Sequence, residues 1–259
     1  MTTAIVGVGN IGGAVARHLV AGGESVVLAA KDQTRAEALA KELGALARAA
    51  SVEDAVAEAD AIVLALWLDA IKELVPRYVR LFEDKVVVDP SNPIAFDANG
   101  QITRTLPERE SAGSVVAALL PAGGHYVKAF GTLGADALAG SANREPRRAV
   151  LFYATDDDAA ATTIERLIHA AGFEPLKAGG VADAGRIEVP GGDLHQAGLN
   201  GALLDLEEAL RYAVTAAAIT CTRTGAVPPT RDEISTWIGT SQTDVSVPPA
   251  LDGADVGFP

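Results

Sequence analysis

The residues best suited to chemistry lie near the start of the chain, in the segment Gly7-Val8-Gly9-Asn10-Ile11-Gly12. This G-x-G-x-x-G spacing follows a short β-branched run and opens a helical pattern, which is the context in which such glycines bind a dinucleotide. Gly7 would allow the tight turn, Gly9 would let a pyrophosphate approach the backbone, and Gly12 would bring helix and strand together. The phosphates would lie on the free N–H groups at the positive end of that helix. The motif therefore predicts a dinucleotide site rather than a structural turn.

The end of the second expected strand indicates which dinucleotide binds. An NAD site usually has an Asp or Glu there to hold the ribose 2′-hydroxyl. This chain instead has two alanines followed by Lys31, with Arg35 one helical turn later. Both cations suit a 2′-phosphate, although Asp32 between them weakens the argument. The pattern favours NADP(H), with a solvated loop as the alternative.

Three further segments follow expected strands and belong to the same sheet edge. They are Leu66-Trp67-Leu68-Asp69, Asp89-Pro90-Ser91-Asn92-Pro93-Ile94 and Lys128-Ala129-Phe130-Gly131-Thr132-Leu133. Ligands of open α/β sheets bind outside the carboxyl ends of the strands, so these segments should line the nicotinamide crevice. Leu66, Trp67, Asn92 and Pro93 are the predicted cofactor contacts. Taken singly, Trp67 could be a core residue, Asn92 a turn residue and Lys128 a surface charge.

Hydrophobic periodicity predicts the elements that position these residues. Strands are expected at 4–8, 25–30, 61–67, 85–89, 126–130, 149–154 and 174–177, and helices at 11–21, 34–43, 51–58, 69–82, 114–120 and 157–171. The apolar run 61–67 is typical of a strand with both faces covered. Strands that alternate with helices imply right-handed crossovers, and hence an α/β fold with one doubly wound parallel sheet.

The last quarter of the chain has a different composition. Residues 199–222 are expected to be mostly helical, with Leu203, Leu206 and Leu210 in one apolar stripe. A Pro-rich tail follows Gly225, with a short helix expected at 231–238. We predict a homodimer with the long helix at the interface and the tail, including Trp237, reaching toward the partner. The alternative is a helix packed on its own domain with a disordered tail.

Charge and composition narrow the class of protein. The formal net charge is −13, which disfavours nucleic acid and anionic membranes as partners. A single cysteine, Cys221, excludes an intrachain disulfide and a thiol-rich metal site, and no metal is expected. The longest apolar run, 61–68, is too short to span a bilayer, and no basic segment precedes the first strand. A soluble, cytoplasmic protein is expected.

The sequence resembles the NADP oxidoreductases that depend on the deazaflavin coenzyme F-420. The resemblance covers residues 4–188 and rests on 7–13, Trp67, Asn92-Pro93, 120–130, Asp156-Asp157 and 179–188. It implies a Rossmann domain with a small C-terminal lobe, and direct hydride transfer between nicotinamide C4 and deazaflavin C5. We place the Rossmann domain at 1–188, and the C-terminal helical lobe with the extended tail at 189–259, whereas family members usually stop well before residue 259. It also implies that residues 9–11 contact the pyrophosphate, Lys31 the 2′-phosphate, and Trp67 and Pro93 the nicotinamide side. The sequence departs from the family at Gly131 and Thr155, where Asn and Gly are common.

Two other functions stay open. An NADPH-dependent reductase of a small imine or carbonyl substrate would need a proton donor, for which His195 or Lys128 could serve. His195 follows a glycine turn where the family's substrate lobe begins, whereas His18, His125 and His169 are scattered. Transfer to a deazaflavin needs no acid or base, only two rings held in contact. A non-enzymatic NADP(H)-sensing module would bind the cofactor without turnover.

Overall fold

The computed structural model describes residues 1–97, 99–221, 230, 233–234 and 236, without the side chains of 217–221. These residues belong to two compact units, Met1–Leu206 and Glu207–Pro259, which are described in turn. The predicted division into residues 1–188 and 189–259 stays a prediction.

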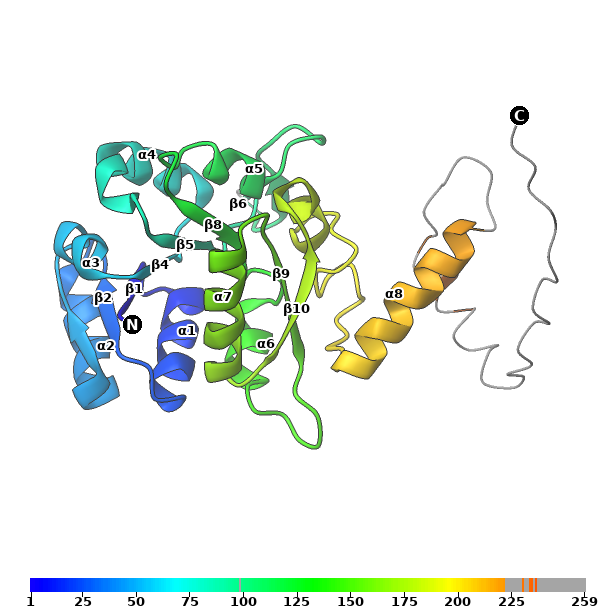
Figure 1. The fold of residues 1–259 in the computed structure, drawn as a ribbon, viewed down its shortest axis with the longest axis horizontal. Helices are drawn as coiled ribbons and strands as arrows, with labels where there is room; N and C mark the ends of the chain where they lie inside the picture. The colour runs from blue at the N-terminus through cyan, green and yellow to red at the C-terminus, as the bar shows by residue number, and fades with distance from the viewer. Residues whose placement is uncertain (98, 222–229, 231–232, 235, 237–259) are drawn as a thin grey trace, which may run out of the picture. The chain divides into compact units, whose positions relative to one another are not determined.

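The first unit is built on an eight-stranded sheet in the order β10-β9-β8-β5-β4-β1-β2-β3 (Figure 1). The strands are β1 Thr3–Val6, β2 Val26–Ala29, β3 Ala47–Ala49, β4 Ala61–Leu64, β5 Val86–Asp89, β8 His125–Lys128, β9 Val150–Ala154 and β10 Glu174–Gly179. From β1 the chain first adds strands on one side and then, from β4, on the other. The order therefore has a switch point between β1 and β4, where ligands of such sheets bind. The predicted doubly wound α/β fold is confirmed.

The expectation that every strand is parallel is wrong at one edge. β8 pairs with β9 in the antiparallel direction, through Lys128 and Ala154, while β9 and β10 are parallel to each other. The connection between β8 and β9 contains only the six-residue helix α6, Ala135–Gly140, which packs beside α1. Periodicity identifies a strand but not its direction, which depends on the path of the connection.

Helices cover both faces of the sheet. They are α1 Asn10–Ala21, α2 Gln33–Leu43, α3 Val52–Glu58, α4 Leu68–Arg77, α5 Ala112–Ala117, α6 and α7 Asp158–Ala170. Side chains of β1 alternate between two core clusters, since Ile5 packs with Leu19 of α1 and Val6 packs with Ile71 of α4. Two covered faces explain why the strands are apolar throughout.

Several predicted boundaries need correction. The helix expected at 69–82 is α4, which contains Pro76 in its last turn, followed by a separate 3₁₀ turn, Val79–Phe82. The helix expected at 199–222 is α8, Leu206–Cys221. Leu203 lies before it and packs on the core of the first unit, so the predicted leucine stripe is interrupted.

A hairpin that the sequence did not predict follows β5. It pairs β6, Ile94–Phe96, with β7, Ile102–Arg104, in the antiparallel direction. The guanidinium of Arg104 donates to the carbonyl oxygens of Leu106, Pro107, Glu110 and Pro190. These bonds anchor the hairpin to the rest of the unit. A 3₁₀ turn, Val181–Ile187, and strand β3 were also missed.

The second unit contains α8. Ala209 and Tyr212 are buried, while Leu210 and Val214 are exposed. The Pro-rich tail with Trp237 lies outside the described residues, as does most of the helix expected at 231–238. The homodimer stays a prediction. In the part of the chain that the structure describes, no helix is long and apolar enough to cross a membrane.

Candidate functional site

The glycines of the first turn have three different roles. Gly7 has φ +98°, and a Cβ there would lie 2.2 Å from the carbonyl oxygen of Ala65. A Cβ on Gly12 would lie 1.9 Å from the carbonyl oxygen of Gly7. A Cβ on Gly9, in contrast, would meet no atom within 4 Å. The fold thus requires Gly7 and Gly12, whereas Gly9 faces open space that a ligand could fill.

The N-terminus of α1 follows this turn without a capping side chain. Gly9 is the N-cap residue, and the first turn contains no acidic side chain. By comparison, Asp32, Ser51 and Asp157 cap α2, α3 and α7 with their side chains. The uncapped N–H groups and the helix dipole make this end of α1 suitable for a phosphate.

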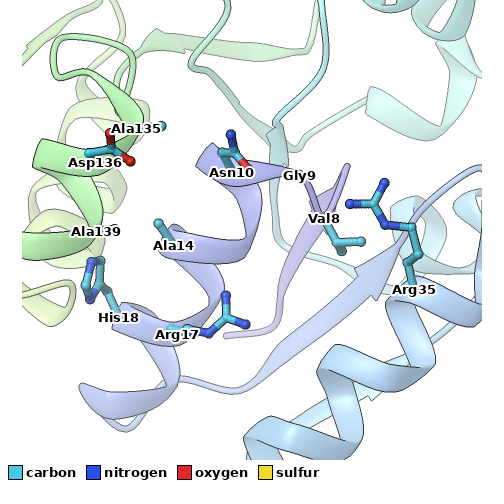
Figure 2. A pocket seen from close by; sticks show the side chains of 10 residues that line it. All are labelled: Val8, Gly9, Asn10, Ala14, Arg17, His18, Arg35, Ala135, Asp136 and Ala139. Atoms are coloured by element: carbon cyan, nitrogen blue, oxygen red, sulfur yellow. The ribbon is translucent and has the colours of Figure 1, made fainter.

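A pocket of about 440 Å³ lies over the N-terminal half of α1 (Figure 2). It is lined by Val8, Gly9, Asn10, Ala14, Arg17, His18, Arg35, Ala135, Asp136 and Ala139. Figure 2 shows Val8 and Arg35 on one side of the helix, and Ala135 and Asp136 of α6 on the other. The pocket brings together Gly9, Asn10 and Arg35 from the sequence prediction. Arg17 contributes less charge, because both its Nε and Nη2 donate to Glu42.

The end of β2 carries the groups expected to select the cofactor. Asp32 accepts a hydrogen bond from the N–H of Thr34 at 3.1 Å, so its carboxylate caps α2. Lys31 and Arg35 are exposed on either side of it. The Asp32 carboxylate is already hydrogen-bonded as the cap of α2, and it lies between two exposed cations. This arrangement fits a 2′-phosphate better than a ribose hydroxyl.

The end of β4 lies against the glycine turn. A Cβ on Gly7 would be 2.9 Å from Cδ2 of Leu66. Trp67, the next residue, is the N-cap of α4 and is 57% exposed. Its ring meets that of Phe96 edge to face, with centroids 5.9 Å apart. The core alternative for Trp67 is therefore wrong.

The loops after β5 and β8 contact each other directly. A Cβ on Gly131 would lie 2.4 Å from the carbonyl oxygen of Pro90. Asn92 joins the same two loops, because its Nδ2 donates to the carbonyl oxygen of Gly131 at 3.2 Å. Its Oδ1 accepts from the N–H of Val189 at 2.9 Å. The Asn92 amide thus serves the protein itself, and the adjacent Pro93 is buried.

Lys128 is enclosed below these loops rather than exposed at the surface. Its Nζ donates to Oδ2 of Asp89 at 3.0 Å and to the carbonyl oxygen of Ser91, and lies 3.3 Å from Oε1 of Glu188. All three side chains that form this ionic group are at most 1% exposed. Burial and the nearby carboxylates raise the pKa of the Tyr126 phenol, which donates to Asp89.

His195 lies close to the same loops. It is 6% exposed, and its Nδ1 accepts a hydrogen bond from the N–H of Ala197 at 3.0 Å. Burial lowers the pKa of the His195 imidazole to about 4, although a hydrogen bond with the backbone of Gly131 acts in the opposite direction. The ring is therefore neutral near pH 7, with Nδ1 as an acceptor.

Sequence reasoning did not identify Glu188, the side chain of Asp89 or Phe96. Glu188 accepts hydrogen bonds from the N–H groups of Ala112 and Gly113 at the start of α5. No spacing in the sequence relates these residues, which are about 75 positions apart. Asp89 could have been noticed as a charged residue that ends an otherwise apolar strand.

The fold and the turn define the class of protein: a dinucleotide-binding protein of the Rossmann type. Residues 2–93 match a family described as NADP oxidoreductase, coenzyme F420-dependent. The hypothetical protein SMa0349 from Sinorhizobium meliloti is 30% identical, with a TM-score of 0.69, and the match covers 79% of this chain and 95% of that chain. The chain belongs to this family and is an NADP-dependent oxidoreductase.

Other solved structures share the fold at lower identity. A protein from Arthrobacter sp. FB24, proposed to be an F420-dependent NADP reductase, is 21% identical with a TM-score of 0.61, over 70% of this chain and 86% of that chain. The reductive aminase from Aspergillus terreus, in complex with NADPH and ethyl levulinate, is 18% identical with a TM-score of 0.52, over 93% and 72%. No curated protein matches the sequence.

Substitution of Gly9 and Gly12 by alanine should give opposite results. Gly9→Ala should keep the free energy of unfolding within about 1 kcal/mol of wild type and abolish tight NADPH binding, because the methyl group enters the ligand space. Gly12→Ala should lower the free energy of unfolding by about 1–3 kcal/mol, because the methyl group meets the Gly7 backbone. Denaturant unfolding and NADPH titration of both variants test this. Normal NADPH affinity in Gly9→Ala would show that the motif is only a turn.

Lys128→Met should destabilise the fold strongly. The substitution leaves the buried carboxylates of Asp89 and Glu188 without their cation, which typically costs about 3–5 kcal/mol. Urea unfolding measures the loss. A variant as stable as wild type, but without activity, would instead support Lys128 as the proton donor.

His195 should make stability depend on pH. Its pKa in the folded chain is about 4, below the usual 6.5, so between these values the unfolded chain binds the extra proton. The free energy of unfolding should therefore fall by up to about 3 kcal/mol as the pH drops from 6.5 to 4. His195→Gln should lack this component. Parallel stability–pH curves for the two proteins would contradict the buried neutral ring.

Proposed function

We propose that this chain transfers a hydride between NADP(H) and a second bound redox partner, and that the partner is the deazaflavin coenzyme F-420. The observation that carries the proposal is the combination of a well-formed dinucleotide turn with the burial of Lys128 and His195, the two proton donors that the sequence suggests. Of the two candidates, Lys128 is enclosed by carboxylates and His195 is neutral near pH 7. When bound, NADP(H) and the deazaflavin would themselves supply the redox chemistry: in the direction of deazaflavin reduction, a hydride would pass from nicotinamide C4 to deazaflavin C5, and water would supply the proton taken up at N1.

The residues of this chain would bind and orient the cofactor. The N–H groups of Asn10 and Ile11 would hold the pyrophosphate above Gly9, where the space for a ligand is open. Lys31 and Arg35 would bind the 2′-phosphate as charge-assisted donors.

The nicotinamide end would lie against the loops that follow β4, β5 and β8. Leu66 and Trp67 supply one wall, and the loop that contains Asn92 and Pro93 supplies another. Asn92 would act by fixing that loop to Gly131, since its own amide is already hydrogen-bonded within the protein. Fixed walls would hold the nicotinamide in one orientation, which is what a hydride transfer between two rings requires.

The alternative function is reduction of a small imine or carbonyl. The reductive aminase from Aspergillus terreus, with NADPH and ethyl levulinate, shares the fold. Such a reduction needs a proton for the product nitrogen or oxygen, and the burial of Lys128 and His195 weighs against both as its source. A non-enzymatic NADP(H)-sensing module would bind the cofactor and turn over no acceptor.

The deciding experiment mixes the protein with NADPH deuterated at C4 and oxidised F-420, and follows the loss of deazaflavin absorbance. We expect turnover, with the deuterium found at deazaflavin C5 by mass spectrometry or NMR. Turnover of a panel of small imines and carbonyls, without any of F-420, would establish the reductase alternative. Tight NADPH binding with no turnover of either would favour the sensing module.

The choice of NADP(H) should depend on Lys31. Lys31→Ala removes a charge-assisted contact of about 1.5–3 kcal/mol, so NADPH should bind about tenfold more weakly or worse, while NADH affinity changes little. Lys41→Ala, at the opposite end of α2, is the matched control. Equal losses for both cofactors in a titration would show that Lys31 does not contact a 2′-phosphate.

A further inference from the structure

Three large apolar side chains lie exposed beside the crevice. Trp67, Phe96 and Ile102 are 57%, 56% and 51% exposed. Trp67 and Phe96 touch edge to face, and Phe96 lies directly opposite Ile102 in the β6–β7 hairpin. Cross-strand partners in an antiparallel pair share one face, so the three side chains form a continuous apolar patch. Exposed apolar patches of this kind commonly mark a binding surface.

The patch is held in place by the fold on both sides. Trp67 is fixed by the start of α4, directly after the two residues that contact Gly7. Phe96 is fixed by the hairpin ladder, which Arg104 anchors through four backbone carbonyl oxygens. Two aromatic rings from separate elements are thus kept in contact with each other while both stay exposed.

The position of the patch indicates what covers it. Trp67 follows β4 at the switch point of the sheet, and the hairpin follows the Asn92-Pro93 loop at the end of β5. The patch is therefore continuous with the proposed nicotinamide walls. A second ligand that exchanges a hydride with the nicotinamide must bring a ring to this place, and an apolar, aromatic surface suits a planar ring.

We propose that Trp67 and Phe96 bind the planar aromatic ring of the second redox partner. This rests on the proposed function, and it assigns Phe96 to the partner rather than to NADP(H). Trp67, which the sequence placed on the nicotinamide side, then forms the wall that both rings share, and Phe96 belongs to the partner site alone.

The test compares wild type with Trp67→Ala and Phe96→Ala, and uses Leu46→Ala as the matched control. Leu46 is 39% exposed and lies directly before the edge strand β3, whereas the patch follows the carboxyl ends of the central strands β4 and β5. Binding of oxidised F-420 is measured by deazaflavin fluorescence with the protein saturated in NADP⁺, a pair that cannot react. NADPH affinity, kcat and the KM for F-420 are measured in parallel.

We expect F-420 affinity to fall about tenfold in Trp67→Ala and about threefold in Phe96→Ala, with the NADPH affinity of Phe96→Ala within about twofold of wild type. Leu46→Ala should match wild type throughout. Unchanged F-420 affinity in both variants would overturn the proposal, as would an equal loss of NADPH affinity in Phe96→Ala. A changed mass in light scattering with unchanged ring binding would assign the patch to a contact between two copies and also overturn it.

Measurements on the wild-type protein distinguish failure of the proposed function from failure of the aromatic site. If wild type neither binds nor turns over F-420, the function is wrong, and the patch is then tested with riboflavin as a planar probe. Riboflavin binding that is lost in Trp67→Ala and kept in Leu46→Ala would support an aromatic-ring site. The lack of any riboflavin binding by wild type would overturn it.

Discussion

The carboxyl edge of the sheet depends on one buried ammonium group. Lys128 ends β8 and places its Nζ between the carboxylates of Asp89, at the end of β5, and Glu188. It also donates to the carbonyl oxygen of Ser91, so a single group joins two strand ends and the segment that follows the last 3₁₀ turn. Charges buried in this way are tolerated only when each finds its partners, and the pairing therefore specifies one arrangement of these loops.

The loops above Lys128 are joined by a second set of contacts around Gly131. Its carbonyl oxygen accepts from Asn92, its Cα packs against Pro90, and its backbone hydrogen-bonds to His195. Lys128 and His195, whose types alone suggest acid–base chemistry, thus both form hydrogen bonds with the backbone of these loops. A reaction that needs only two rings in contact benefits from such rigidity, because orientation supplies most of what the protein can contribute.

The strand and helix pattern allowed much of this fold to be predicted from sequence, because strands covered on both faces and helices capped by Ser51 and Gly44 leave a local signature. The glycine turn was also predictable, since the spacing of its three glycines after a strand and before a helix is a local pattern. Three features were not predictable from sequence: the direction of β9, the ionic group around Lys128 and the hydrogen bonds of Asn92. Each depends on residues 26 to 97 positions apart that meet only in the folded chain. A local pattern carries no information about such partners.

The parts that sequence patterns miss are also the parts that could distinguish one member of this fold from another. The Gly7–Gly12 turn and the covered strands are general requirements of dinucleotide binding. The β6–β7 hairpin is short and half exposed, with a weak apolar pattern, yet Arg104 fixes it and it places Phe96 beside Trp67. A surface that is costly to expose and rigidly held beside the cofactor crevice is suited to discriminating between second ligands. The choice of second ligand by this oxidoreductase would then depend less on the sheet than on the β6–β7 hairpin, which places Phe96 beside Trp67.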